Sequence, residues 1–166
     1  PPPPPPPSPV ETTPPRREPY LISANKPATA SVRGNLADAS VVTNGKKADW
    51  LKDRWQAAKN MKGQAIPGPH FVQVDLEAAC AVDRVVVDFE TAYAKDYEVL
   101  GLSPGGDWVR LAAGAAAAET RPAKQHVVHT LAVSQNVPVS QVKVDIRRPA
   151  TQWGVSVWEL AVYGAC

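Results

Sequence analysis

The stretch that decides the fold reads Arg147-Arg148-Pro149-Ala150-Thr151-Gln152-Trp153-Gly154-Val155-Ser156-Val157-Trp158-Glu159-Leu160-Ala161-Val162-Tyr163-Gly164. It joins a polar loop, which contains Arg, Gln, Trp and Gly, to an alternating strand pattern. In this pattern Trp158, Leu160 and Val162 fall on one face of the strand, and the residues between them fall on the other. The stretch therefore predicts a loop that contacts a ligand and a β-strand that holds the loop in place.

Two further segments precede this stretch and strengthen the interpretation. The first is Val72-Gln73-Val74-Asp75-Leu76. The second begins with Phe89-Glu90-Thr91-Ala92-Tyr93 and continues through Tyr97. It ends with the turn Ser103-Pro104-Gly105-Gly106-Asp107-Trp108. Together, and in this order, the segments resemble the coagulation factor 5/8 type C domain, also called the discoidin or galactose-binding-like domain, which is related to family 32 carbohydrate-binding modules. The resemblance covers residues 26–164 and departs from the usual pattern at Glu77, where Gly is common.

The rest of the chain repeats the signature of short strands separated by turns. Alternating apolar residues predict strands at residues 72–76, 85–89, 97–102, 108–111, 126–133, 142–146 and 156–163. This pattern predicts an all-β jelly-roll β-sandwich of the galactose-binding-like type over residues 20–166. Apolar spacing between Lys47 and Lys62 predicts one or two helical turns, and the Ala-rich residues 112–118 predict a loop with one turn.

The N-terminal residues differ in composition from the rest of the chain. Residues 1–19 contain eleven of the 18 prolines. Because proline has a fixed φ and no backbone donor, we expect a polyproline II stalk or linker of about 60 Å. The segment also resembles extensin-like, hydroxyproline-rich stalks, which implies hydroxylation and O-glycosylation at Pro1, Pro2, Pro3, Pro4, Pro5, Pro6, Pro7, Ser8 and Pro9. An unmodified linker and a ligand for an aromatic groove are the alternatives.

Length and charge limit the classes of function. The 166 residues suffice for one domain, and the formal net charge of +2 comes without a basic stripe, so we expect no nucleic-acid partner. No apolar run has the length of a transmembrane segment. The chain begins with proline instead of a signal segment, which predicts a processed product or a fragment.

The two cysteines, Cys80 and Cys166, lack the spacing of a zinc site. If they form a disulfide, the closed loop would stabilise the fold by roughly 4.5 kcal/mol and would imply an oxidising compartment. The alternative is a pair of free thiols.

The sequence offers no set of catalytic residues. Residues 154–158 begin like the nucleophile elbow of a hydrolase, but Trp158 stands where the closing Gly belongs. The remaining motifs of phosphate, zinc and EF-hand sites are absent from the sequence. We therefore expect a protein that is not an enzyme.

The family resemblance implies a structural calcium or sodium ion. By position, Glu159 matches the Glu of the last strand, Asn44 stands where Asp is usual, and Asp49 stands where a Thr ligand is usual. Hard cations prefer such oxygen ligands. Lys46 occupies a place that Asn often holds, which argues against a complete site. In the alternative interpretation, Glu159 caps a neighbouring backbone or pairs with Lys46.

A sugar site is the second hypothesis. Sugars offer an apolar face to an aromatic ring and hydroxyl groups to bidentate donors, and in the family the ligands sit in the loops at one end of the sandwich. The residues of this kind are Trp153, Arg147, Arg148, Gln152, His70, Tyr93 and Trp55. Either Asp49-Trp50 or Arg54-Trp55 fills the position of the family's Thr-Arg-Trp motif. Alternatively, Trp153 and Tyr93 pack the bases of the loops and the arginines are solvated.

The sequence as a whole predicts a non-catalytic, extracellular glycan-binding and adhesion module on a proline-rich stalk, at the cell surface or in the extracellular matrix. Its partners would be glycans or glycoproteins, and the stalk of one molecule bound by the module of the next would build a fibre. Two alternatives are a carbohydrate-targeting module of a larger enzyme and an intracellular protein-interaction domain of the same fold.

Overall fold

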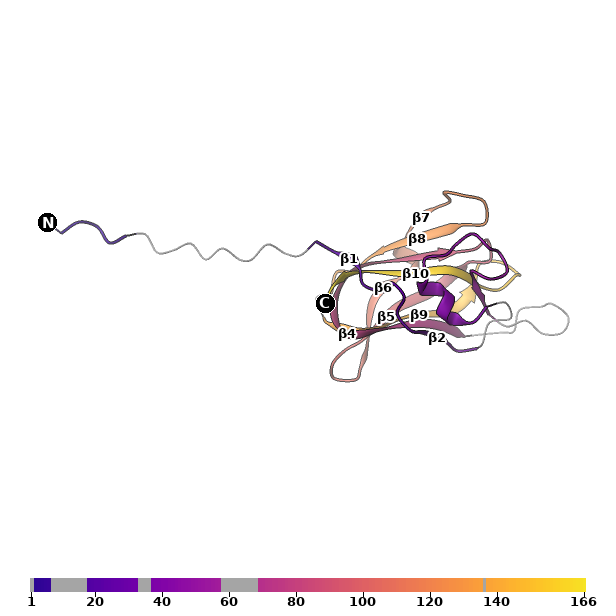
Figure 1. Cartoon of the computed structure of the whole chain (residues 1–166), viewed down its shortest axis with the longest axis horizontal. Helices are drawn as coiled ribbons and strands as arrows, with labels where there is room; N and C mark the ends of the chain where they lie inside the picture. The colour runs from indigo at the N-terminus through magenta and orange to yellow at the C-terminus, as the bar shows by residue number, and fades with distance from the viewer. Residues whose placement is uncertain (1, 7–17, 33–36, 58–68, 136) are drawn as a thin grey trace.

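The computed structural model of the chain describes residues 2–6, 18–32, 37–57, 69–135 and 137–166. Figure 1 shows two antiparallel sheets that pack face to face around one apolar core. The predicted all-β sandwich is confirmed.

The first sheet, called sheet A, contains the strand quoted at the outset. Its order is β10 (Ser156–Ala165), the second half of β4 (His70–Phe89), β8 (Val127–Ala132) and β7 (Ala118–Thr120). Two short strands, β1 (Tyr20–Leu21) and β3 (Trp55–Gln56), pair with opposite ends of β10 at its other edge.

The second sheet, sheet B, packs against sheet A. Its order is β2 (Ala28–Ala30), the first half of β4, β9 (Val139–Pro149), β5 (Ala94–Leu102) and β6 (Trp108–Ala113). Two 3-10 helices, η1 (Ala39–Thr43) and η2 (Gly114–Ala116), lie in the connections.

Strand β4 belongs to both sheets. Its first half pairs with β9, and residues 84–89 pair with β10 on one side and β8 on the other. Glu77 takes a φ of 63° where the strand bends from one sheet to the other. The two predicted strands, residues 72–76 and 85–89, thus lie within one continuous extended element, although its ladder is interrupted at the bend between Asp75 and Cys80.

The core follows the predicted alternation at Leu160 and Val162 but not at Trp158. A register shift between Val157 and Glu159 places Val157 in the core cluster and leaves Trp158 outside it, stacked on His126. Val85, Val87 and Phe89 of β4 pair in register with Val162, Leu160 and Val157 of β10, and all six side chains are buried. The burial of each such side chain contributes roughly 1.5–3 kcal/mol to folding. Among the positions between them, Asp88 and Glu159 are polar and form a cross-strand pair.

A polar bridge crosses this apolar core. The Tyr97 hydroxyl of β5 lies 2.7 Å from Nδ1 of His129 on β8, and Nε2 of His129 lies 2.9 Å from Glu119 on β7. Burial raises the pKa of the Tyr97 phenol, and Glu119 raises it further. The hydrogen bond with His129 lowers the pKa of Glu119. The bridge thus links sheet B through sheet A to the edge strand β7.

The register of the strands gives the sandwich two distinct ends. At the terminal end, Tyr20 pairs with Gly164 and a disulfide joins Cys80 in the bend of β4 to Cys166. At the opposite end, β4 finishes at residue 89, β9 finishes at residue 149 and β10 begins at residue 156. We call this second end the loop end. Figure 1 shows the chain entering the sandwich and leaving it at the terminal end.

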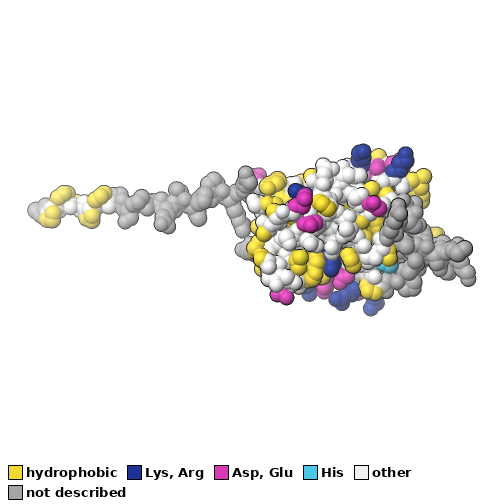
Figure 2. Space-filling model, turned by 60° about the horizontal axis from the view of Figure 1, so that its bottom comes forward, with side chains coloured by type: hydrophobic (Ala, Val, Ile, Leu, Met, Phe, Trp, Pro, Cys, Tyr) yellow, Lys and Arg dark blue, Asp and Glu magenta, His cyan; other side chains and the backbone are white. Residues whose placement is uncertain are grey.

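Other sequence predictions have mixed outcomes. Residues 49–53 form a hydrogen-bonded turn, from Asp53 N–H to the Asp49 carbonyl, but residues 55–56 form strand β3 and not helix. The Ala-rich segment contains the single turn η2, as expected. No helix in the described ranges is long and apolar enough to cross a membrane. On the face shown in Figure 2, acidic and basic side chains are interspersed with apolar and neutral ones.

The proline-rich segment is described only in part. Residues 2–6 are exposed and form neither helix nor strand. The expected modification sites Pro1, Pro7, Ser8 and Pro9 lie outside the described residues. The polyproline II conformation and the modifications therefore stay predictions.

Candidate functional site

Three segments that are distant in sequence meet at the loop end. The Ser156 amide donates to the Ala92 carbonyl (2.7 Å), and the Glu90 amide donates to the Ser156 carbonyl (3.0 Å). The Ala150 amide donates to the Tyr93 carbonyl (2.9 Å). These main-chain bonds join the loop after β9 to the loop after β4, so the side chains of both loops project from one fixed backbone.

The third segment, residues 50–57, is attached by Arg54. Its guanidinium is buried, donates from Nη1 to the Ser156 hydroxyl (2.7 Å) and from Nε to the Trp50 carbonyl (2.7 Å), and lies 4.0 Å from Glu90. Burial lowers the pKa of Arg54, and Glu90 partly compensates. Arg54 thus connects all three segments. Ser156 stands at the nucleophile position of the elbow-like motif, and its hydroxyl oxygen accepts the hydrogen bond from Arg54.

Glu90 stays ionised in this network. Burial favours its neutral form, but bonds from the Thr91 hydroxyl and the Ala92 amide, together with the charge of Arg54, outweigh burial and lower the pKa of Glu90. A buried carboxylate that is paired and hydrogen-bonded in this way holds its neighbours in one geometry. The loop end is therefore a rigid support.

Two tryptophans are exposed on this support. Trp153 is 58% exposed and follows the exposed Gln152, and its amide donates to the Thr151 hydroxyl (3.2 Å). Trp50 is 45% exposed, and the Arg54 guanidinium lies 3.9 Å from the centre of its ring. Aromatic rings that stay in water on a fixed backbone suit stacking against a ligand.

Trp50 was missing from the sequence-based sugar set, which contained Trp55 instead. Trp55 is fully buried, pairs in β3 with Val157 of β10 and donates from Nε1 to the Val32 carbonyl (3.3 Å). Its inclusion was wrong, because no face of its ring is available to a ligand. Both tryptophans follow a charged residue, so the local sequence did not separate the exposed one from the buried one.

The two arginines of the sugar set lie at the end of β9. Arg147 pairs with Glu98 (3.7 Å), and Arg148 pairs with Asp96 (3.8 Å). Both side chains are mostly exposed, so these ion pairs contribute little and leave the guanidinium groups open to further hydrogen bonds. The structure therefore brings the arginines to the same end as Trp153.

Tyr93 and His70 border the same region. Tyr93 is half-buried, its ring packs edge-on against His129, and the Arg121 guanidinium lies 5.5 Å from the ring centre. His70 begins β4 in register with Ile146, the residue before Arg147, and its Nδ1 lies 3.4 Å from the Ser31 hydroxyl. Tyr93 thus serves partly as core, as the alternative interpretation held, and partly as the wall of the loop end.

The residues expected to hold a cation lie elsewhere, on the outer face of sheet A. Glu159 is buried, and its carboxylate accepts hydrogen bonds from the Gly45 amide (3.1 and 3.3 Å). Burial raises the pKa of Glu159 to about 7, against the opposing effects of the Gly45 amide and Lys47. The structure therefore brings Glu159 to the loop that begins at Asn44, as the resemblance implied.

The other two expected ligands are used differently. The Asn44 Oδ1 atom accepts from the Lys46 amide (2.9 Å), and the Asp49 Oδ1 atom accepts from the amides of Leu51 (3.0 Å) and Lys52 (3.1 Å). Asp49 thus stabilises the turn that leads to Arg54. No group of three or more His, Cys, Asp or Glu side chains suited to a metal ion occurs in the described parts of the chain.

Comparison with known proteins supports the same architecture. The F5/8 type C domain model matches residues 22–160. No curated protein matches the sequence. Among solved structures, chitosan-binding module 1 from the chitosanase/glucanase of Paenibacillus sp. IK-5 is similar, with 24% identity, a TM-score of 0.67, and coverage of 87% of this chain and 99% of the module.

Two further similar structures were solved with sugars. The family 32 carbohydrate-binding module of C. perfringens NanJ, in complex with galactose, has 17% identity, a TM-score of 0.65, and coverage of 88% of this chain and 98% of that chain. Chitosan-binding module 2 of the Paenibacillus enzyme, in complex with chitotriose, has 22% identity, a TM-score of 0.62, and coverage of 86% and 99%. These likenesses identify the fold as that of carbohydrate-binding modules.

Proposed function

Because the chain belongs to the F5/8 type C domain family, we propose that it is a non-catalytic, extracellular glycan-binding module whose site is the loop end. The observation that carries the proposal is the exposed ring of Trp153 on a backbone fixed by the bonds of Ser156 and Arg54. A ring held in this way stacks on the apolar face of a sugar without losing much conformational freedom.

The polar residues around Trp153 supply the specificity of this site. Arg147, Arg148 and Gln152 offer planar donors to sugar hydroxyls, and His70 lies next to Arg147 across the β4–β9 ladder. Trp50, on the segment that Arg54 anchors, extends the aromatic surface. The galactose and chitotriose complexes of the similar modules support a saccharide as the ligand class.

A matched pair of tryptophan variants tests the proposal. We expect Trp153→Ala to weaken binding to the glycan selected on a glycan array by tenfold or more, as measured by isothermal titration calorimetry. Trp108→Ala is the control, because Trp108 is also exposed but lies at the terminal end, beside the turn between β5 and β6. Equal affinity of wild type and Trp153→Ala would reject the loop end as the site.

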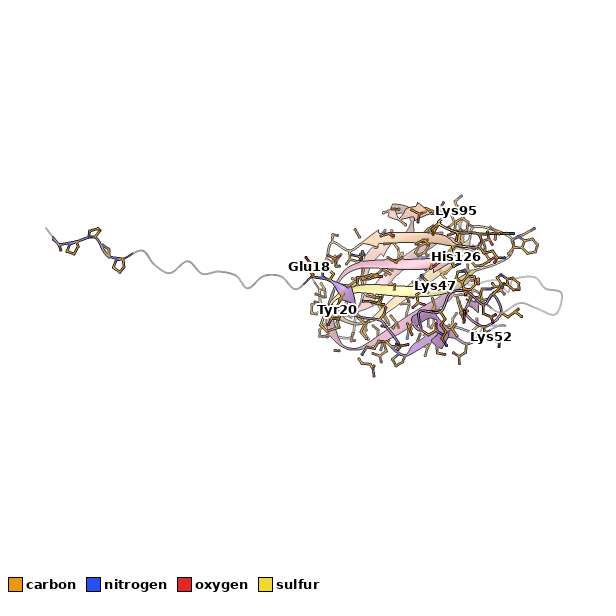
Figure 3. The ribbon with its side chains drawn as sticks, turned by 45° about the horizontal axis from the view of Figure 1, so that its top comes forward. Glu18, Tyr20, Lys47, Lys52, Lys95 and His126 are labelled. Atoms are coloured by element: carbon orange, nitrogen blue, oxygen red, sulfur yellow. A yellow bond between two sulfur atoms is a disulfide. The ribbon has the colours of Figure 1, made fainter. Side chains whose placement is uncertain are left out.

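The position of the termini supports a role in adhesion. Glu18 and Tyr20 enter at the terminal end, whereas Lys52 and Lys95 lie toward the loop end (Figure 3). A glycosylated proline-rich segment at the terminal end would leave the loop end free to bind the proline-rich segment of a neighbouring molecule. Such a head-to-tail contact does not form a closed ring, so repeated contacts build a fibre. Light scattering of the native protein tests this role: particles that shrink to monomers after deglycosylation support it, and monomers throughout contradict it.

The disulfide supports an extracellular location. Cys80 and Cys166 are joined, and such bridges persist in oxidising compartments. This observation disfavours the intracellular protein-interaction domain. Intact mass spectrometry of the protein from its native source tests the location, since unmodified prolines with two free thiols would contradict it.

A carbohydrate-targeting module of a larger enzyme is the second candidate function. The observation that favours it is that two of the similar structures are modules of a chitosanase/glucanase. A catalytic domain encoded in the full-length gene would decide for this candidate. Binding at the loop end is expected in either case.

A further inference from the structure

Two buried carboxylates lie side by side on the outer face of sheet A. Asp88 of β4 and Glu159 of β10 are direct cross-strand partners, and only 5% and 7% of their surfaces are exposed. Adjacent buried carboxylates repel each other and lose hydration, so they require positive charge or hydrogen-bond donors in the folded protein. If the protein itself supplies this charge and these donors, the loop of residues 44–49 does not depend on a metal ion.

The chain itself supplies the donors. The Lys47 ammonium lies 3.4 Å from one oxygen of Asp88, and Nδ1 of His126 lies 2.9 Å from the other. The Gly45 amide donates to Glu159, and the charge of Lys47 also favours the ionised form of this residue. In Figure 3, Lys47 and His126 are labelled close together over this face of the sheet.

His126 is itself fixed in this arrangement. Its ring stacks on Trp158 with a centroid distance of 4.9 Å, and the Trp158 Nε1 donates to the Gln125 carbonyl (2.8 Å). Because a carboxylate only accepts, the 2.9 Å contact is a donation from His126 Nδ1 to Asp88. Asp88 therefore has a donor on each of its two oxygens.

The residues present do not fit the cation that the family implies. The Asn44 Oδ1 and Asp49 Oδ1 atoms already accept from backbone amides, and the Glu159 carboxylate accepts from the Gly45 amide. A calcium ion needs six to eight oxygens that point at it, and here N–H groups point at the oxygens. A divalent ion beside Asp88 and Glu159 would also be repelled by the Lys47 ammonium.

We propose that Lys47 is the built-in counter-ion of this face and takes the role of a bound metal ion, so that the module folds and binds its ligand without calcium. The consequence reaches the loop end, because the loop that carries Lys47 continues directly into the turn at Asp49 and from there to Trp50 and Arg54. The ligand-binding part of the statement rests on the proposed glycan-binding function, whereas the folding part does not.

Thermal unfolding of the wild-type chain with calcium chloride or with a chelator tests the folding part. A cation at a hundred times its Kd would raise the melting temperature of a chain of this size by roughly 5–10 °C. We expect a shift below about 1 °C, and no binding heat when calcium is titrated into the chelator-treated protein. A calcium-dependent rise in melting temperature would overturn the proposal.

Neighbouring lysine variants test the role of Lys47 itself. We expect Lys47→Ser to lower the melting temperature by roughly 4 °C and Lys47→Arg to keep most of the stability. Lys46→Ser is the matched control, because the side chain of Lys46 is exposed like that of Lys47 but makes no ion pair in the described part of the chain. Equal melting temperatures of Lys47→Ser and Lys46→Ser would also overturn the proposal. If Lys47→Ser does not fold, Lys47→Arg and the calcium titration still decide.

Glycan binding in chelator gives a separate readout. We expect equal affinity in calcium and in chelator. Binding that disappears in chelator would contradict the inference. Absence of glycan binding in both buffers would reject the proposed function and leave the melting results for Lys47 unaffected.

Discussion

The two ends of the sandwich are held together by different kinds of interaction. The terminal end is closed by the Cys80–Cys166 disulfide and by main-chain pairing of β1 with β10. The loop end is closed by the buried Arg54, which contacts Ser156 and Glu90. The covalent link constrains the chain and presents no ligand surface, whereas the polar network fixes a backbone from which exposed side chains project. We therefore expect changes at the terminal end to alter stability alone and changes in the polar network of the loop end to alter both stability and binding, and the following variants test this difference.

Removal of the disulfide should have the largest effect on stability. The bridge spans 86 residues, and the chain-entropy model gives about 4.5 kcal/mol for a loop of this length. We expect Cys80→Ala/Cys166→Ala to lose about this much in guanidinium unfolding, with unchanged glycan affinity in the folded protein. A loss of affinity at unchanged stability would reverse the roles assigned to the two ends.

Arg54→Met should come next. It leaves the buried Glu90 without its positive partner, and removal of one partner from a buried pair costs about 4 kcal/mol. Unlike loss of the disulfide, this change should also weaken glycan binding, because the Trp50 segment loses its anchor. Arg147→Met is the matched control for stability: its ion pair is exposed, so we expect a loss below about 1 kcal/mol.

The pH dependence of stability should report on Glu159. Its pKa is raised to about 7 in the folded protein, chiefly by burial. The folded state therefore binds this proton more tightly than the unfolded state, so the contribution of Glu159 to stability is fully present below its unfolded pKa and falls by about 3 kcal/mol as the pH rises from about 4.5 to about 7. Glu159→Gln should remove this fall in urea unfolding at a series of pH values; a fall of the same size in the variant would contradict the assignment.

The smallest change concerns the polar bridge between the two sheets. Tyr97→Phe removes the hydroxyl that bonds His129 and should cost about 1 kcal/mol in chemical unfolding without changing ligand affinity. Tyr163→Phe is the control, because Tyr163 is only half-buried and contacts Arg84 through its ring. A similar loss in both variants would show that the hydroxyl bond of Tyr97 is not the cause.

The strands of sheet B could be predicted because burial alternates with a period of two over most of β5 and β9. In the closing strand β10, residues 156–162 are all buried, so there only the apolar pattern of the sequence indicated a strand. Leu160 and Val162 face the core as the sequence indicated, and residues 72–76 and 85–89 are extended. The continuity of β4 could not be predicted, because the residues of the bend lack that alternation. Its pairing with both sheets depends on long-range contacts that a local pattern does not contain.

The site was predictable in kind but not in every member. The loop with Gln152 and Trp153 is exposed as predicted, since a polar loop after a strand projects from the sheet end. The sequence pattern assigned the buried Trp55 to the sugar site in place of the exposed Trp50, because β3 has only two residues and provides no periodicity. The positive partner near Glu159 is Lys47 and not Lys46, because adjacent side chains in an irregular loop point in directions that spacing does not determine.

The course of β4 has a mechanical consequence. Tension applied through the N-terminal segment enters at Tyr20, passes to Gly164 of β10 by main-chain pairing, and reaches the bend of β4 through Cys166 and Cys80. Because that single strand runs through both layers, the load is shared between them close to the point of attachment. A ligand bound at the loop end, as proposed, would be separated from such a pull by the length of the sandwich.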